Sequence, residues 1–213
     1  MMPAKAETVP EMEFHPVDRD RWPDLVRLFE HHGNPGYCWC MRWRAPSRAF
    51  NDLKTAGRKE ALHRLVQAGT PVGVLGYING EPAGWCSIAP RETYTALARS
   101  RVLRVLQRSD GQPVWAVVCF FLDRSVRGRG FMLKLLQAAV EFARSQGAAA
   151  VEGYPMEHPT GSYRWMGSPA LFRRAGFFEA GRPGGGRLHM RYEFQEPGLS
   201  SVPPVQSPKA GLP

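Results

Sequence analysis

The stretch from Val114 to Gly147 constrains the fold most strongly, because two contrasting hydrophobic patterns meet there through a short turn rich in glycine and arginine. Val114 to Leu122 form a continuous run of β-branched, aromatic and other apolar residues. Such a run is too short to span a membrane and is typical of a strand buried on both faces. From Phe131 onward, apolar residues recur at helical spacing until Gly147, which suits the position after a helix end. The stretch therefore predicts a central strand, a turn and a long helix.

The turn itself, Arg127 to Gly130, combines the features of an anion-binding site. The start of a helix presents unpaired N–H groups and the positive end of the helix dipole. Gly128 and Gly130 leave those donors accessible, and Arg127 and Arg129 add positive charge. Three or four charge-assisted hydrogen bonds, each worth about 1.5–3 kcal/mol, would hold a pyrophosphate at micromolar concentration. The turn therefore predicts a ligand with two or more phosphate groups.

Two familiar phosphate-binding loops do not fit this turn. A Walker A loop ends in Gly-Lys-Ser or Gly-Lys-Thr, and the sequence contains neither triplet. The dinucleotide-binding motif requires a third glycine at the position that Leu133 occupies. The ligand is therefore not expected to be a nucleotide bound in either of these ways.

The turn resembles the acetyl-coenzyme A loop of the GNAT superfamily of N-acetyltransferases. The motif of that family is Arg or Gln, two residues, Gly, one residue, and then Gly or Ala. Here Arg127 and Gly130 match it, whereas Met132 replaces the small final residue. The resemblance implies that the loop amides bind the pyrophosphate of acetyl-CoA, used as a co-substrate, and that the end of the preceding strand hydrogen-bonds the pantetheine arm. The cofactor-binding residues that it implies are Phe120, Phe121, Leu122, Arg127, Gly128, Arg129, Gly130, Phe131 and Met132.

Hydrophobic periodicity and turn residues predict the remaining elements. The pair Asn79 and Gly80 suits the positive φ angles of a type I′ hairpin turn. The predicted strands are 13–17, 72–78, 82–89, 114–122, 148–154, 177–180 and 188–194, and the further helices are 20–32, 51–67, a short one within 91–112 and one between Ser168 and Gly176. Their order resembles the full GNAT arrangement over residues 12–194. That resemblance implies an α/β (α+β) fold, with a mixed, mostly antiparallel, twisted sheet, a central parallel strand pair and helices on both faces.

The chain ends and the composition narrow the class of protein. Residues 1–11 predict a flexible N-terminus, and residues 195–213 predict a disordered Pro-rich tail. The formal net charge is +9, but arginines spread along the chain carry most of it, which disfavours nucleic acid as a partner. No apolar run suits a secretory signal or a membrane span, and four cysteines without a disulfide pattern suit a reducing compartment. A cytoplasmic protein with no membrane partner is therefore expected.

An aromatic segment after the first helix invites two interpretations. Either Tyr37, Trp39 and Trp43 close one end of the core, or they line the acceptor pocket, because the equivalent GNAT segment commonly covers the substrate. Cys38 and Cys40 lack the paired Cys or His spacing that would complete a metal site, so no metal is predicted. Two residues of a later loop, Glu157 and His158, are further candidates for the substrate pocket.

The candidate catalytic residues are Glu152, Tyr154 and Tyr163. Glu152 interrupts an apolar strand, so its carboxylate must face a cleft, where it would serve as general base, or pair with an arginine. GNAT enzymes usually carry a tyrosine as general acid four residues before the glycine that closes the short helix, and this chain has Phe172 there. Tyr154 or Tyr163 could replace it, or the weakly basic thiolate could take its proton from water.

The resemblance implies an N-acetyltransferase that moves an acetyl group from acetyl-CoA to a primary amine of a small molecule or peptide. It further implies direct transfer in a ternary complex, with the acceptor entering where the two parallel strands separate. Phe172 and the missing carboxylate on the central strand motivate an alternative, a non-catalytic acyl-CoA-binding module. The acceptor and the oligomeric state, with a homodimer as one option, stay open.

Overall fold

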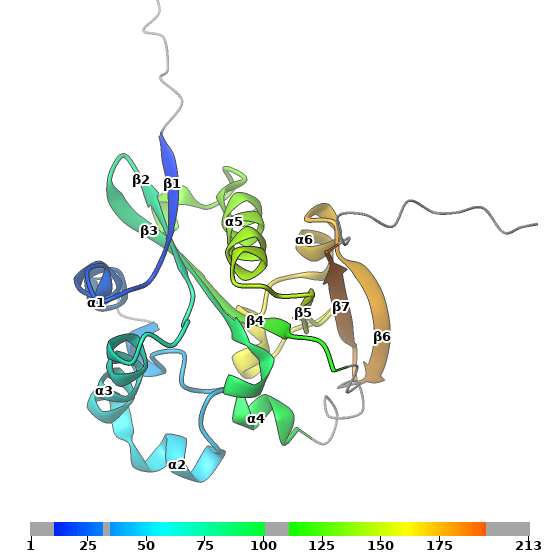
Figure 1. Ribbon diagram of the computed structural model, residues 1–213, viewed down its shortest axis with the longest axis horizontal. Coiled ribbons are helices and arrows are strands. Elements are labelled where there is room, and N and C mark those ends of the chain that lie inside the picture. Colours follow the sequence, from blue (N-terminus) through cyan, green and yellow to red (C-terminus); the bar gives the residue numbers. More distant parts are fainter. Residues whose placement is uncertain (1–10, 32–34, 101–110, 195–213) are drawn as a thin grey trace, which may run out of the picture.

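A mixed sheet of seven strands forms the centre of the molecule (Figure 1). The computed structural model describes residues 11–31, 35–100 and 111–194. The strand order is β1-β2-β3-β4-β5-β7-β6. The strands are β1 (Met12–Pro16), β2 (Val74–Ile78), β3 (Glu81–Pro90), β4 (Val114–Leu122), β5 (Ala150–Gly153), β6 (Phe178–Gly184) and β7 (Arg187–Glu193).

Only β4 and β5 run parallel; every other neighbouring pair is antiparallel. The parallel register extends from Val114 opposite Ala150 to Val117 opposite Gly153. There β5 ends, while β4 continues to Leu122. The two central strands therefore separate along the second half of β4.

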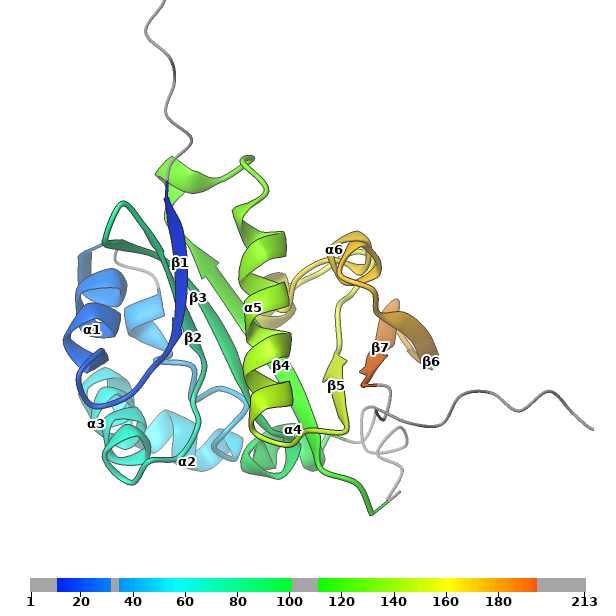
Figure 2. The same cartoon turned by 45° about the horizontal axis from the view of Figure 1, so that its top comes forward.

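Helices cover both faces of the sheet (Figures 1 and 2). One face carries α5 (Phe131–Ser145) and α6 (Pro169–Arg174). The opposite face carries α1 (Trp22–His31), α2 (Ser47–Asp52), α3 (Lys54–Gln67) and α4 (Thr95–Ala98). Short 3-10 turns lie at η1 (Pro35–Tyr37), η2 (Arg91–Thr93), η4 (Arg124–Val126) and η5 (Gly161–Trp165). None of the helices in the described ranges is long and apolar enough to cross a membrane.

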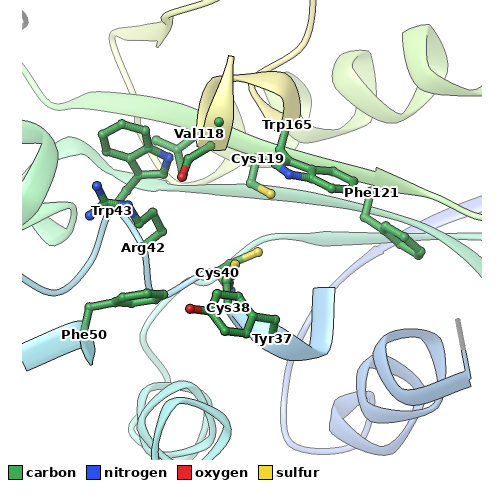
Figure 3. A pocket seen from close by; sticks show the side chains of 12 residues that line it. Tyr37, Cys38, Cys40, Arg42, Trp43, Phe50, Val118, Cys119, Phe121 and Trp165 are labelled. Carbon is green, nitrogen blue, oxygen red and sulfur yellow. Dashed lines mark hydrogen bonds between the residues drawn. The ribbon is translucent and has the colours of Figure 1, made fainter. Parts of the chain in front are cut away.

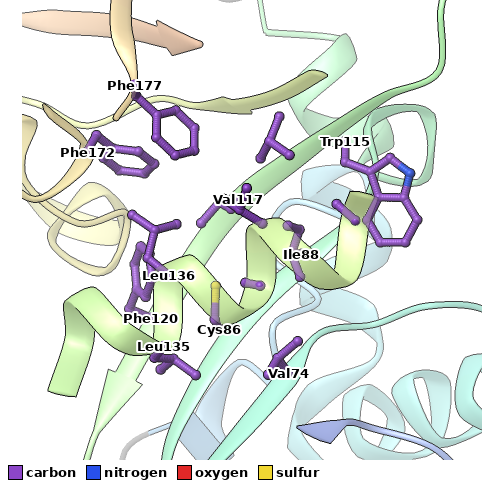
Figure 4. Packing of buried hydrophobic residues seen from close by; sticks show 14 of the residues in the cluster. Val74, Cys86, Ile88, Trp115, Val117, Phe120, Leu135, Leu136, Phe172 and Phe177 are labelled. Carbon is purple, nitrogen blue, oxygen red and sulfur yellow. The ribbon is translucent and has the colours of Figure 1, made fainter. Parts of the chain in front are cut away.

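The packing of α5 fixes where this helix begins. Leu135 and Leu136 of α5 lie fully buried in the cluster that contains Ile88 and Val117 of the sheet (Figure 4). Phe131, the first residue of α5, is equally buried, and its ring lies over Gly84, where an added Cβ would come within 2.5 Å of it. Burying such side chains stabilises the fold by roughly 1.5–3 kcal/mol each. Because Gly84 pairs with Leu122, the N-terminus of α5 is held against the sheet at the end of β4.

Most predicted elements are present, and the fold class is confirmed. The hairpin turns at Asn79 and Gly80, with φ angles of 50° and 79° as a type I′ turn requires. Ser168 caps α6 by accepting a hydrogen bond from the Leu171 N–H. The predicted helix over 51–67 is instead two helices, α2 and α3, because Lys54, the first residue of α3, takes a positive φ of 50°. The predicted N-terminal and C-terminal tails fall almost wholly outside the described residues.

Candidate active site

The turn between β4 and α5 has an open, left-handed backbone. Gly128 and Gly130 take φ angles of 78° and 74°, which L side chains rarely adopt. A Cβ at either position would meet nothing within 4 Å, so the backbone borders open space. Gly130 is the N-cap of α5 and provides no side-chain cap, which leaves the first N–H groups of the helix without an intrahelical acceptor. This geometry suits a phosphate group at the positive end of the helix.

The two arginines of the turn have different surroundings. Arg127 donates from Nε and Nη2 to the carbonyl oxygen of Leu122, at 3.3 and 3.0 Å, and so ties the turn to the end of β4. Arg129 is exposed. Asp123 braces the same strand end, because its Oδ1 accepts hydrogen bonds from the backbone N–H and the hydroxyl of Ser125 at 2.7 and 2.6 Å. Both arginines are exposed, and Arg127 in addition shapes the loop through its hydrogen bonds to Leu122.

A β-bulge interrupts β4 where the central strands separate. Ser87 pairs with Cys119 and Ile88 pairs with Val117, so Val118 is an extra residue in β4. A bulge re-aims the side chains of its strand. Val118 and the adjacent Cys119 consequently line the same pocket.

This pocket is the candidate acceptor site. It has a volume of about 380 Å³ and opens beside the bulge, on the face of the sheet that carries α1 to α4 (Figure 3). Three segments that are distant in the sequence form its walls. They contribute Tyr37, Trp43 and Phe50 from the segment after α1, Cys119 and Phe121 from β4, and Trp165 from η5. A largely apolar pocket of this size is typical of a small-molecule site.

Comparison with known proteins decides the family. The model of the "Acetyltransferase (GNAT) family" matches residues 37–157, which is more than half of the chain. The chain belongs to the GNAT acetyltransferase family. An acyltransferase that uses acetyl-CoA or a related acyl-CoA follows from this membership, and the predicted family resemblance is confirmed. No protein among the curated sequences matches the chain.

Solved structures agree with this assignment at the level of the fold. An agmatine N-acetyltransferase mutant has a TM-score of 0.54 at 15% identity, over 86% of this chain and 99% of that chain. A putative GNAT-family acetyltransferase from Desulfovibrio desulfuricans has a TM-score of 0.51 at 13% identity, over 86% and 99% of the two chains. The ribosomal-protein-S5-alanine acetyltransferase from Vibrio fischeri has a TM-score of 0.50 at 12% identity, over 87% of this chain and 97% of that chain. Such low identities show a shared fold and leave the acceptor open.

The predicted pocket residues occupy different places in this GNAT fold. Tyr37 and Trp43 line the pocket. Trp39 is 1% exposed and packs in the core, with its ring centroid 5.2 Å from that of Phe29. Glu157 and His158 are exposed and do not line the pocket, and Glu157 pairs with Arg182. Phe50, Cys119 and Trp165 were not nominated from the sequence, because no local pattern tells which aromatic or thiol side chain will face a cavity.

Glu152 lies at the centre of a buried charge network. Its carboxylate accepts hydrogen bonds from Arg91 at 3.1 and 3.2 Å, from Arg191 at 2.8 Å and from the Tyr154 hydroxyl at 2.6 Å. His189 Nε2 lies 3.2 Å from the carboxylate. Burial alone would raise the pKa of Glu152, but the adjacent His189, the hydrogen bond from Tyr154 and the charge of Arg91 lower it from 4.5 to about 2. Of the two alternatives that the sequence left open for Glu152, facing a cleft or pairing with an arginine, the structure shows the arginine pairing.

The tyrosine candidates differ in their access to the cleft. Tyr154 is fully buried, and burial together with the charge of Glu152 raises its pKa. Tyr163 lines a second cavity beside the pocket, where its ring lies edge-on to Trp43 with centroids 5.3 Å apart. Phe172 is buried between other aromatic rings, at 6.2 Å from Phe120 and 5.0 Å from Phe177 between centroids. Tyr163 is the candidate that borders the cleft.

Two of the pocket thiols, Cys38 and Cys40, are protonated near neutral pH. All four cysteines are free. The neighbouring Cys40 thiol and burial raise the pKa of Cys38, and the Cys119 thiol and burial raise the pKa of Cys40. Trp85 donates from Nε1 to the Cys40 sulfur at 3.1 Å. A thiol with a raised pKa is a poor nucleophile and a poor metal ligand, and within the described ranges no group of three His, Cys, Asp or Glu residues is placed to hold a metal ion.

Proposed function

We propose that the protein is an acetyl-CoA-dependent N-acetyltransferase, which moves the acetyl group to a primary amine of a small molecule or peptide by direct attack in a ternary complex. The observation that carries this proposal is the continuity of three features along β4. These are the pocket, the bulge at Val118 and the open helix N-terminus at Gly130. A carrier whose diphosphate lies at Gly130 and whose arm follows the free half of β4 delivers its thioester to the bulge, beside the pocket.

The chemistry requires a neutral amine and a proton for the departing thiolate. The amine nitrogen attacks the thioester carbonyl, the C–S bond breaks, and the nitrogen loses a proton as the thiolate gains one. Among the described residues that line the pocket there is no Asp, Glu or His. Glu152 is held as a carboxylate by two arginines, which suits a positioning role more than a general base. We therefore infer that the acceptor enters as the neutral amine.

For the proton donor, Tyr163 is the tyrosine that we retain, because it borders the cleft while Tyr154 is committed to Glu152. Its replacement by Phe removes only the hydroxyl. The expected result is a fall in kcat of about tenfold or more, because the departing coenzyme A thiolate loses its proton donor, with coenzyme A binding unchanged. The control is Tyr192→Phe, at a position that lines neither cavity. If Tyr163→Phe and wild type have the same kcat, Tyr163 is not the proton donor and water takes that role.

The function is tested directly by incubating the protein with acetyl-CoA and a panel of primary amines and measuring the release of free thiol. Amine-dependent thiol release and an acetylated product detected by mass spectrometry support it. The alternative, a non-catalytic acyl-CoA-binding module, is favoured by one observation, the buried Phe172 at the position of the family's tyrosine. Thermal stabilisation by acetyl-CoA without release of thiol for any amine supports that alternative.

A further inference from the structure

The pocket beside β4 continues into a second cavity. This neighbouring cavity has a volume of about 610 Å³, and four residues line both spaces: Arg42, Trp43, Gly161 and Ser162. The first space is mostly aromatic and apolar, whereas the second adds Arg99 and several hydroxyl groups to its lining. The two form one cleft, which runs from the thioester position at the bulge toward arginine side chains.

The charged side chains of the described cleft residues all have the same sign. Among the described residues that line the two cavities, the formally charged side chains are Arg42 and Arg99, and none is an Asp or Glu. A positively charged group of a ligand would therefore lose its hydration without meeting a carboxylate, which is costly. An anionic group would meet a guanidinium instead.

Arg42 is the arginine that lines both cavities, and its surroundings leave hydrogen-bonding capacity for a ligand. Its guanidinium carbon lies 5.6 Å from the ring centroid of Trp43 and 5.8 Å from that of Phe50, within the range of a cation–π contact with each ring. Its hydrogen bond within the described part of the chain is a long one, 3.4 Å, to the Ser47 hydroxyl. A guanidinium has five N–H donors in a planar fork, so Arg42 has donors available for a carboxylate or a similar planar anion. Figure 3 shows the Arg42 and Trp43 side chains together at one end of the pocket.

We propose that the acceptor is a primary amine with an apolar or aromatic body and an anionic group, such as a carboxylate, and that Arg42 binds this group. This inference rests on the proposed N-acetyltransferase function. The apolar body fills the space between Phe50 and Trp165, the anion pairs with Arg42, and the amine reaches the bulge at Val118. Dicationic amines are poor acceptors, because no carboxylate among the described lining residues is present to receive the second charge.

Matched amine pairs test the proposal. L-Phenylalanine is compared with 2-phenylethylamine, and L-tryptophan with tryptamine, because each pair differs by one carboxylate; agmatine represents the dications. Binding is measured by calorimetry with saturating coenzyme A, and transfer by thiol release with acetyl-CoA. Wild type is expected to prefer the carboxylate member of a pair by about tenfold or more, the value of a charge-assisted hydrogen bond in a partly dry site.

The variants Arg42→Gln and Arg42→Lys separate recognition from packing. Arg42→Gln is expected to lower the ratio of affinities within each pair by about tenfold, while Arg42→Lys, which keeps the charge, restores part of it. Arg48→Gln is the control, since Arg48 is exposed on α2 and lines neither cavity. The proposal is overturned if both members of a pair weaken equally in Arg42→Gln, if agmatine binds best, or if no carboxylate amine binds.

The failure of this inference and of the proposed function are distinguishable. If coenzyme A itself gives no binding heat, the acetyltransferase proposal fails. If coenzyme A binds and a neutral or cationic amine is acetylated in preference to its carboxylate partner, only the assignment of an anionic acceptor fails.

Discussion

The role of Glu152 could be narrowed to two explanations from the sequence, and the structure distinguishes them. A carboxylate in an apolar strand is costly unless it is paired or faces a cleft, and both explanations were open from the sequence. Which one holds depends on Arg91 and Arg191, which lie 61 and 39 residues away in the chain. No local pattern places those arginines on the same face of the sheet as Glu152, so only the assembled sheet distinguishes the two explanations.

Replacing this carboxylate tests its structural role. Glu152→Gln leaves two arginines largely buried without their counter-charge, so the free energy of unfolding is expected to fall by about 3–5 kcal/mol. Urea unfolding at pH 7 measures it. The control is Glu193→Gln, because Glu193 pairs with the same Arg191 at 2.9 Å but is exposed. An exposed pair contributes about 0–1 kcal/mol; equal losses for the two variants would contradict the buried network.

The low pKa of Glu152 also predicts how stability depends on pH. Its pKa in the folded protein is about 2, below the ordinary 4.5, so the unfolded chain binds the proton more readily. The stabilisation is therefore fully present above pH 4.5 and is lost as the pH falls toward 2, and it amounts to roughly 3 kcal/mol at pH 7. The difference in unfolding free energy between wild type and Glu152→Gln should shrink between pH 5 and pH 3. A difference that stays constant over this range would argue against an ionised, buried Glu152.

The absence of a base among the described pocket residues makes a prediction about the reaction. If the amine must arrive neutral, log kcat/KM rises with pH at a slope of about 1 and bends at the pKa of the acceptor itself. Two acceptors with different amine pKa values, assayed from pH 6 to 10, should bend at different pH values. A shared bend near neutral pH would reveal a base in the protein.

At the scale of elements, the turn before α5 was accessible to sequence reasoning because its determinants are local. The glycines at positive φ, the strand before them and the helix after them all lie within one continuous segment, Val114 to Ser145. The hairpin at Asn79 and the cap at Ser168 are local in the same sense. The break at Lys54 was not predictable, since the apolar spacing of residues 51–67 continues through it. Arg58 fixes that corner through the carbonyl oxygens of Phe50 and Tyr37, both at 2.9 Å.

The two arginines of the turn should respond differently to substitution. Arg127→Ala removes the hydrogen bonds to the Leu122 carbonyl, so a loss of about 1 kcal/mol in unfolding free energy is expected. Arg129→Ala should leave stability within about 0.5 kcal/mol and weaken acetyl-CoA binding by about tenfold. Urea unfolding and calorimetry measure the two quantities. Arg144→Ala, at the far end of α5, controls for net charge; the same loss of affinity there would show a non-specific charge effect.

At the scale of the whole molecule, the pocket exists only because three segments converge on β4. The sequence nominated Tyr37 and Trp43, since aromatic residues gather after the first helix. It nominated Trp39 for the same reason, yet Trp39 and Cys40 take φ angles of 45° and 49°, and the resulting tight turn places the Trp39 ring in the core. Trp165 enters from η5, more than 120 residues later, and completes the wall. The shape of the acceptor pocket depends on contacts between segments that are distant in the sequence. The sequence therefore indicated the family through a local motif but did not indicate the acceptor.

Binding of acetyl-CoA at the N-terminus of α5 is the claim on which the proposed function depends, and a matched pair of glycine variants tests it most directly. Gly130 and Gly69 have nearly equal φ angles, 74° and 71°, and both border open space, but Gly69 lies after α3, away from the turn. Replacing either by Ala should therefore cost a similar 1 kcal/mol or so in stability.

Calorimetric titration with acetyl-CoA is the deciding measurement. Wild type and Gly69→Ala are expected to bind with a dissociation constant on the order of micromolar, and Gly130→Ala about tenfold or more weaker. No binding heat for wild type, or equal affinities for the two variants, would contradict a diphosphate site at the start of α5.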